Sequence, residues 1–258
     1  MTTTTVDVPT PDGTADALLV TPDLGSPHPA VLLYMDAFGV RPRLAQMAER
    51  IAAQGYVVLV PNVFHRAGHA PVVDLVDLMA PENRPSMMAT LGPLMAALTP
   101  GRAVADAGAY LEFLAGHPAV ADGPVGTTGY CMGGALALRT AAAYPDRVSA
   151  AASFHGGHLA TDAPDSPHLG AATTTAEVYV AHADGDSSAT PEQQERLESA
   201  LTRAGVTHRT ELYAGASHGF TMTDTAAYSA EAEQRHWTEL LALLDRTSGR
   251  PVPGRRLP

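Results

Sequence analysis

The sequence predicts an α/β fold in which helices cover both faces of one mostly parallel sheet. Short strand-like segments alternate with helical segments along most of the 258 residues, which is the pattern of a parallel sheet with connecting helices. Residues 30–35 are apolar throughout, as parallel strands buried on both faces are. The glycine-rich segment 126–135 joins a strand to a helix. A chain of this length can form one domain, so we expect residues 1–258 to be a single domain.

The elements are placed by their apolar patterns and by the residues that start and stop them. Residues 11–13, Pro-Asp-Gly, are a turn signal that makes the first two strands an antiparallel pair. Gly55 ends the first helix and Pro145 follows the third, while the fourth begins at Pro191 and ends before Gly205. We expect strands at 6–9, 15–20, 30–35, 56–60, 124–125, 148–154, 177–181 and 207–213, and helices at 42–54, 102–115, 135–144, 191–204 and 227–246.

Residues 62–100 do not follow the alternation of strands and helices. They contain five prolines and a methionine-rich segment at 87–98. Long irregular segments in compact domains are commonly lids over active sites. We therefore expect residues 62–100 to cover the functional site, and residues 249–258 to form a flexible, solvated tail.

The composition limits the partners and the chemistry. The net charge of −11 argues against nucleic acid and anionic membranes as partners. The sequence has no lysine, which excludes Schiff-base chemistry and a Walker lysine. One cysteine excludes an intrachain disulfide and a CxxC pair. The N-terminus lacks the features of a signal peptide, and no apolar run approaches the ~20 residues of a membrane span, so we expect a cytoplasmic protein.

Gly129-x-Cys131-x-Gly133 matches a nucleophile elbow in which cysteine takes the place of the commoner serine. The glycines allow a sharp turn and a close approach of strand and helix, which exposes the residue between them. A helix N-terminus favours a thiolate there. The backbone N–H of Met132 would then face the oxyanion that forms on an attacked carbonyl. The alternative interpretation is a small buried core cysteine beside a tight turn.

An acid and a histidine follow the elbow in the order that this architecture requires. Asp184 and Asp186 come after the strand at 177–181, and His218 comes after the strand at 207–213. The histidine would take the thiol proton, and the carboxylate would hold the imidazole in the required tautomer. Three such residues at the ends of three different strands point to covalent catalysis by Cys131.

A competing serine motif occurs at 215–219, which reads Gly-Ala-Ser-His-Gly. It would make Ser217 the nucleophile, but an acid and a histidine would have to follow within the last 40 residues. The sequence after Phe220 is also a poor start for a helix. We therefore favour Cys131.

Two patterns could be interpreted as metal sites. A calcium-loop spacing begins at Asp184 and ends at Glu195, but Ala189 stands where the loop requires glycine. His65 and His69 could share a helical face, yet they lie in a stretch rich in glycine and proline without an acidic third ligand. We expect no metal site.

Four segments together resemble the dienelactone hydrolase family. They are Met-Asp-Ala-Phe-Gly-Val at 35–40, Pro-Asn-Val-Phe-His-Arg at 61–66, Gly-Tyr-Cys-Met-Gly-Gly at 129–134 and Ala-Ser-His-Gly-Phe at 216–220. The resemblance extends from about Val6 to Asp245. It implies an α/β-hydrolase fold and a Cys-Asp-His triad that acts on lactones or related esters without a cofactor.

The resemblance also implies roles for individual residues. It makes Cys131 the nucleophile, His218 the base and Asp186 the acid. The oxyanion would be bound by the backbone N–H groups of Met132 and Ala37. The further residues expected to contact the substrate are Phe38, Arg66, Arg84, Tyr130, His155 and Phe220.

The chain departs from the family pattern at two places. Well-known members have a glutamate that holds the resting thiol and helps to activate it, where this chain has Asp36. We therefore expect the carboxylate of Asp36 to lie close to Cys131 and to take part in catalysis, with a looser coupling to the thiol. Well-known members also have an arginine shortly after the catalytic histidine, where this chain has Thr-Met-Thr at 221–223. We therefore expect the pocket to favour neutral or weakly polar esters and lactones. The alternative function is a protein of the same fold that binds a small ligand without catalysis.

Overall fold

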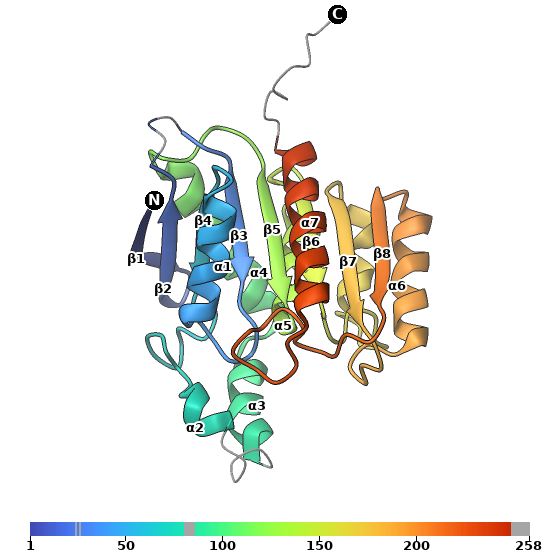
Figure 1. Cartoon of the computed structure of the whole chain (residues 1–258). Coiled ribbons are helices and arrows are strands. Elements are labelled where there is room, and N and C mark those ends of the chain that lie inside the picture. Colours follow the sequence, from blue (N-terminus) through green and yellow to red (C-terminus); the bar gives the residue numbers. More distant parts are fainter. Residues whose placement is uncertain (24, 26, 80–85, 249–258) are drawn as a thin grey trace, which may run out of the picture.

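The protein is described by a computed structural model, in which residues 1–23, 25, 27–79 and 86–248 are placed (Figure 1). The expected tail at 249–258 lies outside the described residues, as does Arg84. Among the described residues, no helix is long and apolar enough to cross a membrane.

The core of the molecule is an eight-stranded sheet with the order β1-β2-β4-β3-β5-β6-β7-β8. The strands β3 to β8 run parallel to one another, and β1 and β2 form an antiparallel pair that joins the sheet antiparallel to β4. The strands are β1 Thr2–Thr10, β2 Gly13–Thr21, β3 Ala30–Tyr34, β4 Val57–Pro61, β5 Val125–Tyr130, β6 Val148–Phe154, β7 Glu177–Ala183 and β8 His208–Tyr213. The predicted α/β fold with a mostly parallel sheet is confirmed.

Helices lie on both faces of this sheet. Helices α1 and α7 cover the face toward the viewer in Figure 1, and α4 and α5 cover the opposite face. The helices are α1 Pro42–Ala52, α2 Leu75–Met79, α3 Met87–Ala97, α4 Pro100–Gly116, α5 Met132–Ala143, α6 Pro191–Ala204 and α7 Ala230–Thr247, and a 3-10 helix, η2, spans Pro167–Thr173. The 3-10 helix has no periodic apolar pattern in the sequence, and it was not predicted.

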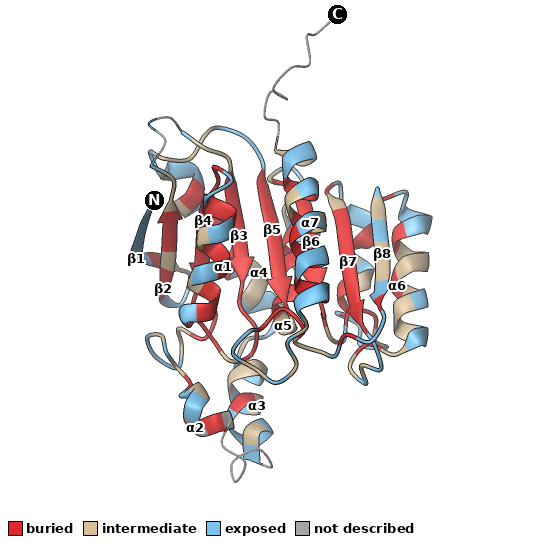
Figure 2. Cartoon of the chain, in the orientation of Figure 1, coloured by how far each residue is buried: buried red, intermediate tan, exposed pale blue. Residues whose placement is uncertain are grey.

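Every residue of the central strands β3, β4 and β5 is buried (Figure 2). Helix α1 packs against β4 and the neighbouring β2, and Leu44, Met47 and Ile51 on its apolar face are fully buried. Burying a side chain of this size contributes about 1.5–3 kcal/mol to the free energy of unfolding. The apolar pattern of the sequence therefore locates the core correctly.

Strand β5 is longer than the sequence indicated, because glycines at 126 and 129 made its second half resemble a loop. A methyl group at Gly126 would contact the side chain of Leu244 on α7 at 2.5 Å. The glycine therefore lets α7 approach the sheet closely. Strand β7 is longer as well, so His182 and Ala183 belong to the strand.

Residues 62–100 contain two helices, α2 and α3, which lie below the carboxyl ends of the parallel strands in Figure 1. Leu91 of α3 joins a small buried cluster with Ala37, Val73 and Leu78. This cluster ties α3 to the loop after β3. The function of residues 62–100 as a lid remains a prediction.

Candidate active site

Cys131 lies at the turn between β5 and α5 with a strained backbone. Its φ and ψ angles are 56° and −119°, in a region that residues with a side chain rarely adopt. A methyl group at Gly129 would collide with the carbonyl of Gly133, and one at Gly133 would collide with the carbonyl of Met35. Only glycine fits at these two positions. The turn has the geometry of a nucleophile elbow, and the thiol is partly exposed at its tip.

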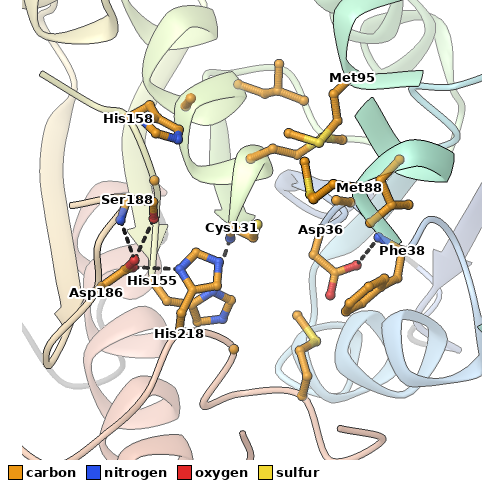
Figure 3. Close-up of a pocket in the computed structure, with 18 of the residues that line it drawn as sticks. Asp36, Phe38, Met88, Met95, Cys131, His155, His158, Asp186, Ser188 and His218 are labelled. Carbon is orange, nitrogen blue, oxygen red and sulfur yellow. Dashed lines mark hydrogen bonds and ion pairs between the residues drawn. The ribbon is translucent and has the colours of Figure 1, made fainter. Parts of the chain in front are cut away.

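His218 and Asp186 lie beside the elbow, each at the carboxyl end of a strand (Figure 3). The Nδ1 atom of His218 is 2.6 Å from Oδ2 of Asp186. The other carboxylate oxygen of Asp186 accepts hydrogen bonds from the backbone N–H and the hydroxyl of Ser188, at 2.8 and 2.6 Å. Cys131 and His218 line the same cavity, and Cys131 contributes to the raised pKa of His218. The structure therefore brings the three sequence-predicted residues together in a chain.

The surroundings of His218 favour the charged, imidazolium form of its side chain. Burial alone would lower the pKa of His218, but its hydrogen bonds to Asp186 and Cys131 raise the pKa to about 10. Burial alone would raise the pKa of Asp186, but its hydrogen bonds to His218 and Ser188 lower the pKa to about 2. Asp186 is therefore an anion at neutral pH, and it stabilises an imidazolium at His218.

His155 supports the elbow from beneath. The backbone N–H of Cys131 donates to the carbonyl of Phe154 at 3.1 Å and to Nδ1 of His155 at 3.2 Å. Burial lowers the pKa of His155 well below its ordinary value, so the ring is neutral. With Nδ1 as an acceptor, Nε2 carries the proton and donates to Oγ1 of Thr221 at 2.8 Å. His155 lines the cavity as expected, but both its nitrogens are already paired, Nδ1 with the backbone N–H of Cys131 and Nε2 with Thr221.

The two expected oxyanion donors lie on either side of the elbow. Ala37 follows β3, Met132 begins α5, and both line the cavity in front of Cys131. Neither of their N–H groups has a hydrogen-bond partner among the residues that the structure describes. Both are therefore available to bind a developing negative charge.

Asp36 lies at the end of β3 and lines the cavity, but its carboxylate is held by Arg41. Its Oδ1 accepts from Nη1 of Arg41 at 2.7 Å and from the backbone N–H of Phe38 at 3.0 Å. Its Oδ2 accepts from Nη2 of Arg41 at 2.9 Å. Burial raises the pKa of Asp36, and the guanidinium of Arg41 counteracts that rise. The sequence analysis expected this carboxylate to be directed at the thiol and missed Arg41.

Arg41 also pairs with a second acid, which the sequence analysis missed. Its Nε donates to Oδ2 of Asp224 at 2.6 Å. Asp224 lies 183 residues away along the chain. No local sequence pattern connects the two residues.

A cavity of about 760 Å³ opens in front of Cys131 (Figure 3). One wall is α3, which contributes Met87, Met88, Leu91 and Met95. Phe38, expected to contact the substrate, lies on another side. The methionine-rich segment therefore gives this wall of the cavity an apolar surface.

Two residues expected to contact the substrate lie elsewhere, in the core. Tyr130 is fully buried, and its hydroxyl is 2.9 Å from Nε2 of His236. It precedes Cys131 on a strand, and neighbouring side chains on a strand point to opposite faces. Phe220 is fully buried too, between His155 and Tyr213. Neither residue lines the cavity.

Arg66 does not line the cavity either. Its guanidinium makes two hydrogen bonds to the buried carboxylate of Asp106, at 2.7 and 2.9 Å, and it also pairs with Asp12. This arginine fastens the loop after β4 to α4. His65 joins the same network at 3.3 Å from Asp106.

The competing sequence patterns do not form sites in the structure. Ser217 is exposed and does not line the cavity, and no helix follows it until α7. The carboxylate of Asp184 accepts the backbone N–H of Gly215 at 2.8 Å. Among the described residues, no group of histidine, cysteine and acidic side chains could hold a metal ion.

The comparison with known proteins agrees with this geometry. The model of the dienelactone hydrolase family matches residues 15–248. The chain belongs to the dienelactone hydrolase family. A carboxymethylenebutenolidase of Rhodococcus opacus is 30% identical over 227 residues, which are 87% of this chain and 83% of that protein. A carboxymethylenebutenolidase of Pseudomonas putida is 25% identical over 239 residues, which are 90% of this chain and 92% of that protein.

Solved structures of dienelactone hydrolase relatives have the same fold. A dienelactone hydrolase-like promiscuous phosphotriesterase from metagenomic libraries superimposes with a TM-score of 0.80 at 25% identity, over 96% of this chain and 99% of that one. The resemblance inferred from four sequence segments is thus confirmed, together with the α/β-hydrolase fold.

His182 is a buried histidine outside the group formed by Cys131, His218 and Asp186. It lies at the end of β7, and neither ring nitrogen has a partner among the described residues. Burial lowers its pKa to about 4, although Asp186 and Glu198 act in the opposite direction. Its ordinary pKa is 6.5. Between these two pH values the unfolded chain binds the proton more tightly, so the free energy of unfolding decreases as the pH falls through this range.

Replacing His182 by leucine should flatten this acid dependence. One proton contributes a slope of about 1.4 kcal/mol per pH unit, and the variant should lose about that much of the slope between pH 6.5 and 4. Urea unfolding at several pH values measures it. If the slope of the free energy of unfolding against pH is unchanged in His182→Leu, the buried imidazole takes up its proton while the protein stays folded.

Proposed function

We propose that the protein hydrolyses lactones or small esters through an acyl-enzyme on Cys131. The observation that carries this proposal is the chain from Cys131 through His218 to Asp186 at the rim of the cavity. Family membership makes the chain an ester or lactone hydrolase. The names of the Rhodococcus and Pseudomonas relatives support lactone opening as the reaction class.

In the first step, the thiolate of Cys131 attacks the carbonyl carbon of the substrate. A thioester bond to Sγ forms as the carbon–oxygen bond to the leaving group breaks. His218 holds the thiol proton and delivers it to the leaving oxygen. For a lactone, the leaving alcohol or enol stays attached to the acyl chain through the ring that has opened.

In the second step, water releases the acyl group. His218 accepts a proton from the water molecule, the resulting hydroxide attacks the thioester, and the thiolate leaves. The hydrolysis consumes one water and produces one carboxylic acid, and the enzyme returns to its starting state. Asp186 remains an anion throughout and holds Nδ1 of His218, so that Nε2 faces the reacting atoms.

The oxyanion of both tetrahedral intermediates would be bound by the N–H groups of Ala37 and Met132. The start of α5 packs closely against the end of β3, because a methyl group at Gly133 would collide with the carbonyl of Met35. Removing one such donor in another hydrolase costs ~3–4 kcal/mol of transition-state stabilisation.

A burst experiment tests the proposal against its rival, a protein of this fold that binds without catalysis. Mixing the protein with an activated 4-nitrophenyl ester should release one nitrophenolate per active site rapidly, followed by slower steady turnover. The amplitude should scale with the protein concentration. Saturable binding of the ester with neither burst nor turnover would favour the binding protein.

A further inference from the structure

Arg139 lines the catalytic cavity on the same helix as the oxyanion donor Met132. Helix α5 contributes Met132, Ala135, Leu136 and Arg139 to the cavity wall. Residues with this spacing lie on one face of a helix. Arg139 is seven residues from Met132, on the order of 10 Å farther along the helix axis.

Arg139 differs from the other arginines that the structure describes. It is partly buried, and within the described part of the chain it has neither a hydrogen bond nor an ion pair. The other buried and partly buried arginines in the described part all pair with a carboxylate, as Arg41 does with Asp36 and Arg147 with Glu112. An arginine without such a partner has up to five N–H donors available for a ligand.

The charges around Arg139 leave it positive. Burial lowers its pKa, and the nearby carboxylate of Asp165 counteracts this effect. An arginine remains protonated at neutral pH despite such shifts. Asp165 itself is exposed and makes no hydrogen bond to Arg139. An anion that entered the cavity would therefore meet a cation that is already partly desolvated.

The first turn of helix α4 adds positive potential to the same wall. Helices α4 and α5 lie side by side, because Tyr144 packs at Gly108 and the guanidinium of Arg147 donates to the carbonyl of Leu111. Pro100 and Ala103 of the first turn of α4 line the same cavity as Arg139. The N-terminal end of a helix carries a partial positive charge.

We propose that Arg139 binds a carboxylate of the substrate at the far end of the cavity, separated by an apolar chain from the carbonyl that Cys131 attacks. The inference rests on the proposed function and names its substrate class, esters or lactones with a terminal acidic group. The span of ~10 Å along α5 corresponds to about eight carbon–carbon bonds of an extended chain. Leu136 of α5 and the side chains of α3 supply the apolar surface between the two ends.

This proposal differs from the expectation of a pocket for neutral substrates. That expectation considered only an arginine after His218 and the candidates Arg66 and Arg84. Arg66 is occupied by Asp106, and Arg84 lies outside the described residues. The cation comes instead from the helix that follows the nucleophile.

Matched substrates test the proposal. The 4-nitrophenyl monoester of suberic acid and 4-nitrophenyl octanoate have the same chain length and differ in their terminal group. We expect kcat/KM to be at least about tenfold higher for the acid, which corresponds to about 1.4 kcal/mol. The succinic monoester should show no advantage, because its carboxylate falls short of Arg139. Acetyl esters of ω-hydroxyoctanoic acid and of octanol test the same preference on the alcohol side.

Arg139→Gln should abolish the preference for the acid, so that the suberic monoester and 4-nitrophenyl octanoate have about equal kcat/KM in the variant. Arg203→Gln, at an exposed arginine on α6, removes the same charge and should keep the preference. A preference that is absent in both substrate series, or that survives in Arg139→Gln, would overturn the proposal.

A binding measurement separates this proposal from the proposed function. The monoamide of suberic acid cannot be cleaved as an ester, and calorimetry gives its affinity for the Cys131→Ala protein. We expect binding at least about tenfold weaker when Arg139→Gln is added. If no ester is hydrolysed but this difference persists, the chemistry of Cys131 is wrong and the anion site is right. If neutral esters are hydrolysed and the difference is absent, the anion site is wrong.

Discussion

Cys131→Ala should lower kcat by roughly 10⁴-fold or more, because it removes the atom that forms the bond to the substrate. The oxyanion donors and the cavity would remain, so substrate affinity should change little. The matched control is Ser217→Ala, the residue of the competing serine motif, which is exposed and outside the cavity. Near-normal turnover in Cys131→Ala combined with loss in Ser217→Ala would reverse the assignment.

Chemical modification gives a second measure of the same effect. Cys131 is the single cysteine of the chain, so the thiol content of the protein reports this side chain alone. Iodoacetamide should remove activity in proportion to the fraction of thiol alkylated. A saturating apolar ester should slow the alkylation, because Cys131 lines the cavity that the ester would fill.

Asp186→Asn should lower kcat by about 10⁴-fold, the loss seen when the orienting aspartate of a serine protease is replaced by asparagine. Asp186 accepts from Nδ1 of His218 at 2.6 Å and is buried, so its charge acts through little water. An asparagine can donate to Nδ1 and thereby stabilise the wrong tautomer. The loss should come with a lower pKa of His218, since the hydrogen bond to Asp186 is a main cause of its rise to about 10.

Asp184→Asn is the matched control for this substitution. Asp184 lies on the same loop, but its carboxylate accepts the backbone N–H of Gly215 at 2.8 Å. An asparagine oxygen can accept the same hydrogen bond, so kcat should change by less than about threefold. Steady-state kinetics and a pH profile of both variants measure the difference. The opposite ranking of the two variants would transfer the orienting role to Asp184.

The sequence was sufficient to predict the nucleophile elbow and the order of Cys131, Asp186 and His218 along the chain. Gly129 and Gly133 leave a local pattern because a side chain at either position would collide with backbone. Asp186 and His218 are recognisable because each follows a strand, and the carboxyl ends of parallel strands meet at one edge of a sheet. These inferences required only local patterns and the direction of the strands, apart from the choice of Asp186 over Asp184, which the family resemblance supplied.

Contacts between distant segments could not be predicted in this way. The pair of Arg41 and Asp224 joins residues from opposite ends of the chain, and only the folded structure brings them together. The burial of Phe220 likewise depends on packing against Tyr213 and His155.

Two features of the cavity follow from the strand and helix repeats once the ends of β5 and α5 are known. Side chains alternate along a strand, so Tyr130 and Cys131 could not both face the cavity while β5 continued to residue 130. The helical repeat places Arg139 on the same face as Met132, which indicates a cation on the same wall of the cavity. Both signals depend on knowing where β5 ends and α5 begins.

Mass spectrometry of the protein during turnover tests the central claim most directly. The protein is mixed with a slowly hydrolysed 4-nitrophenyl ester, quenched in acid during the burst and digested with a protease. The peptide that contains Cys131 should carry the mass of the acyl group, and the adduct should disappear as the substrate is consumed. An adduct on the peptide that contains Ser217, or continued turnover with no adduct on Cys131 at any time, would contradict the mechanism.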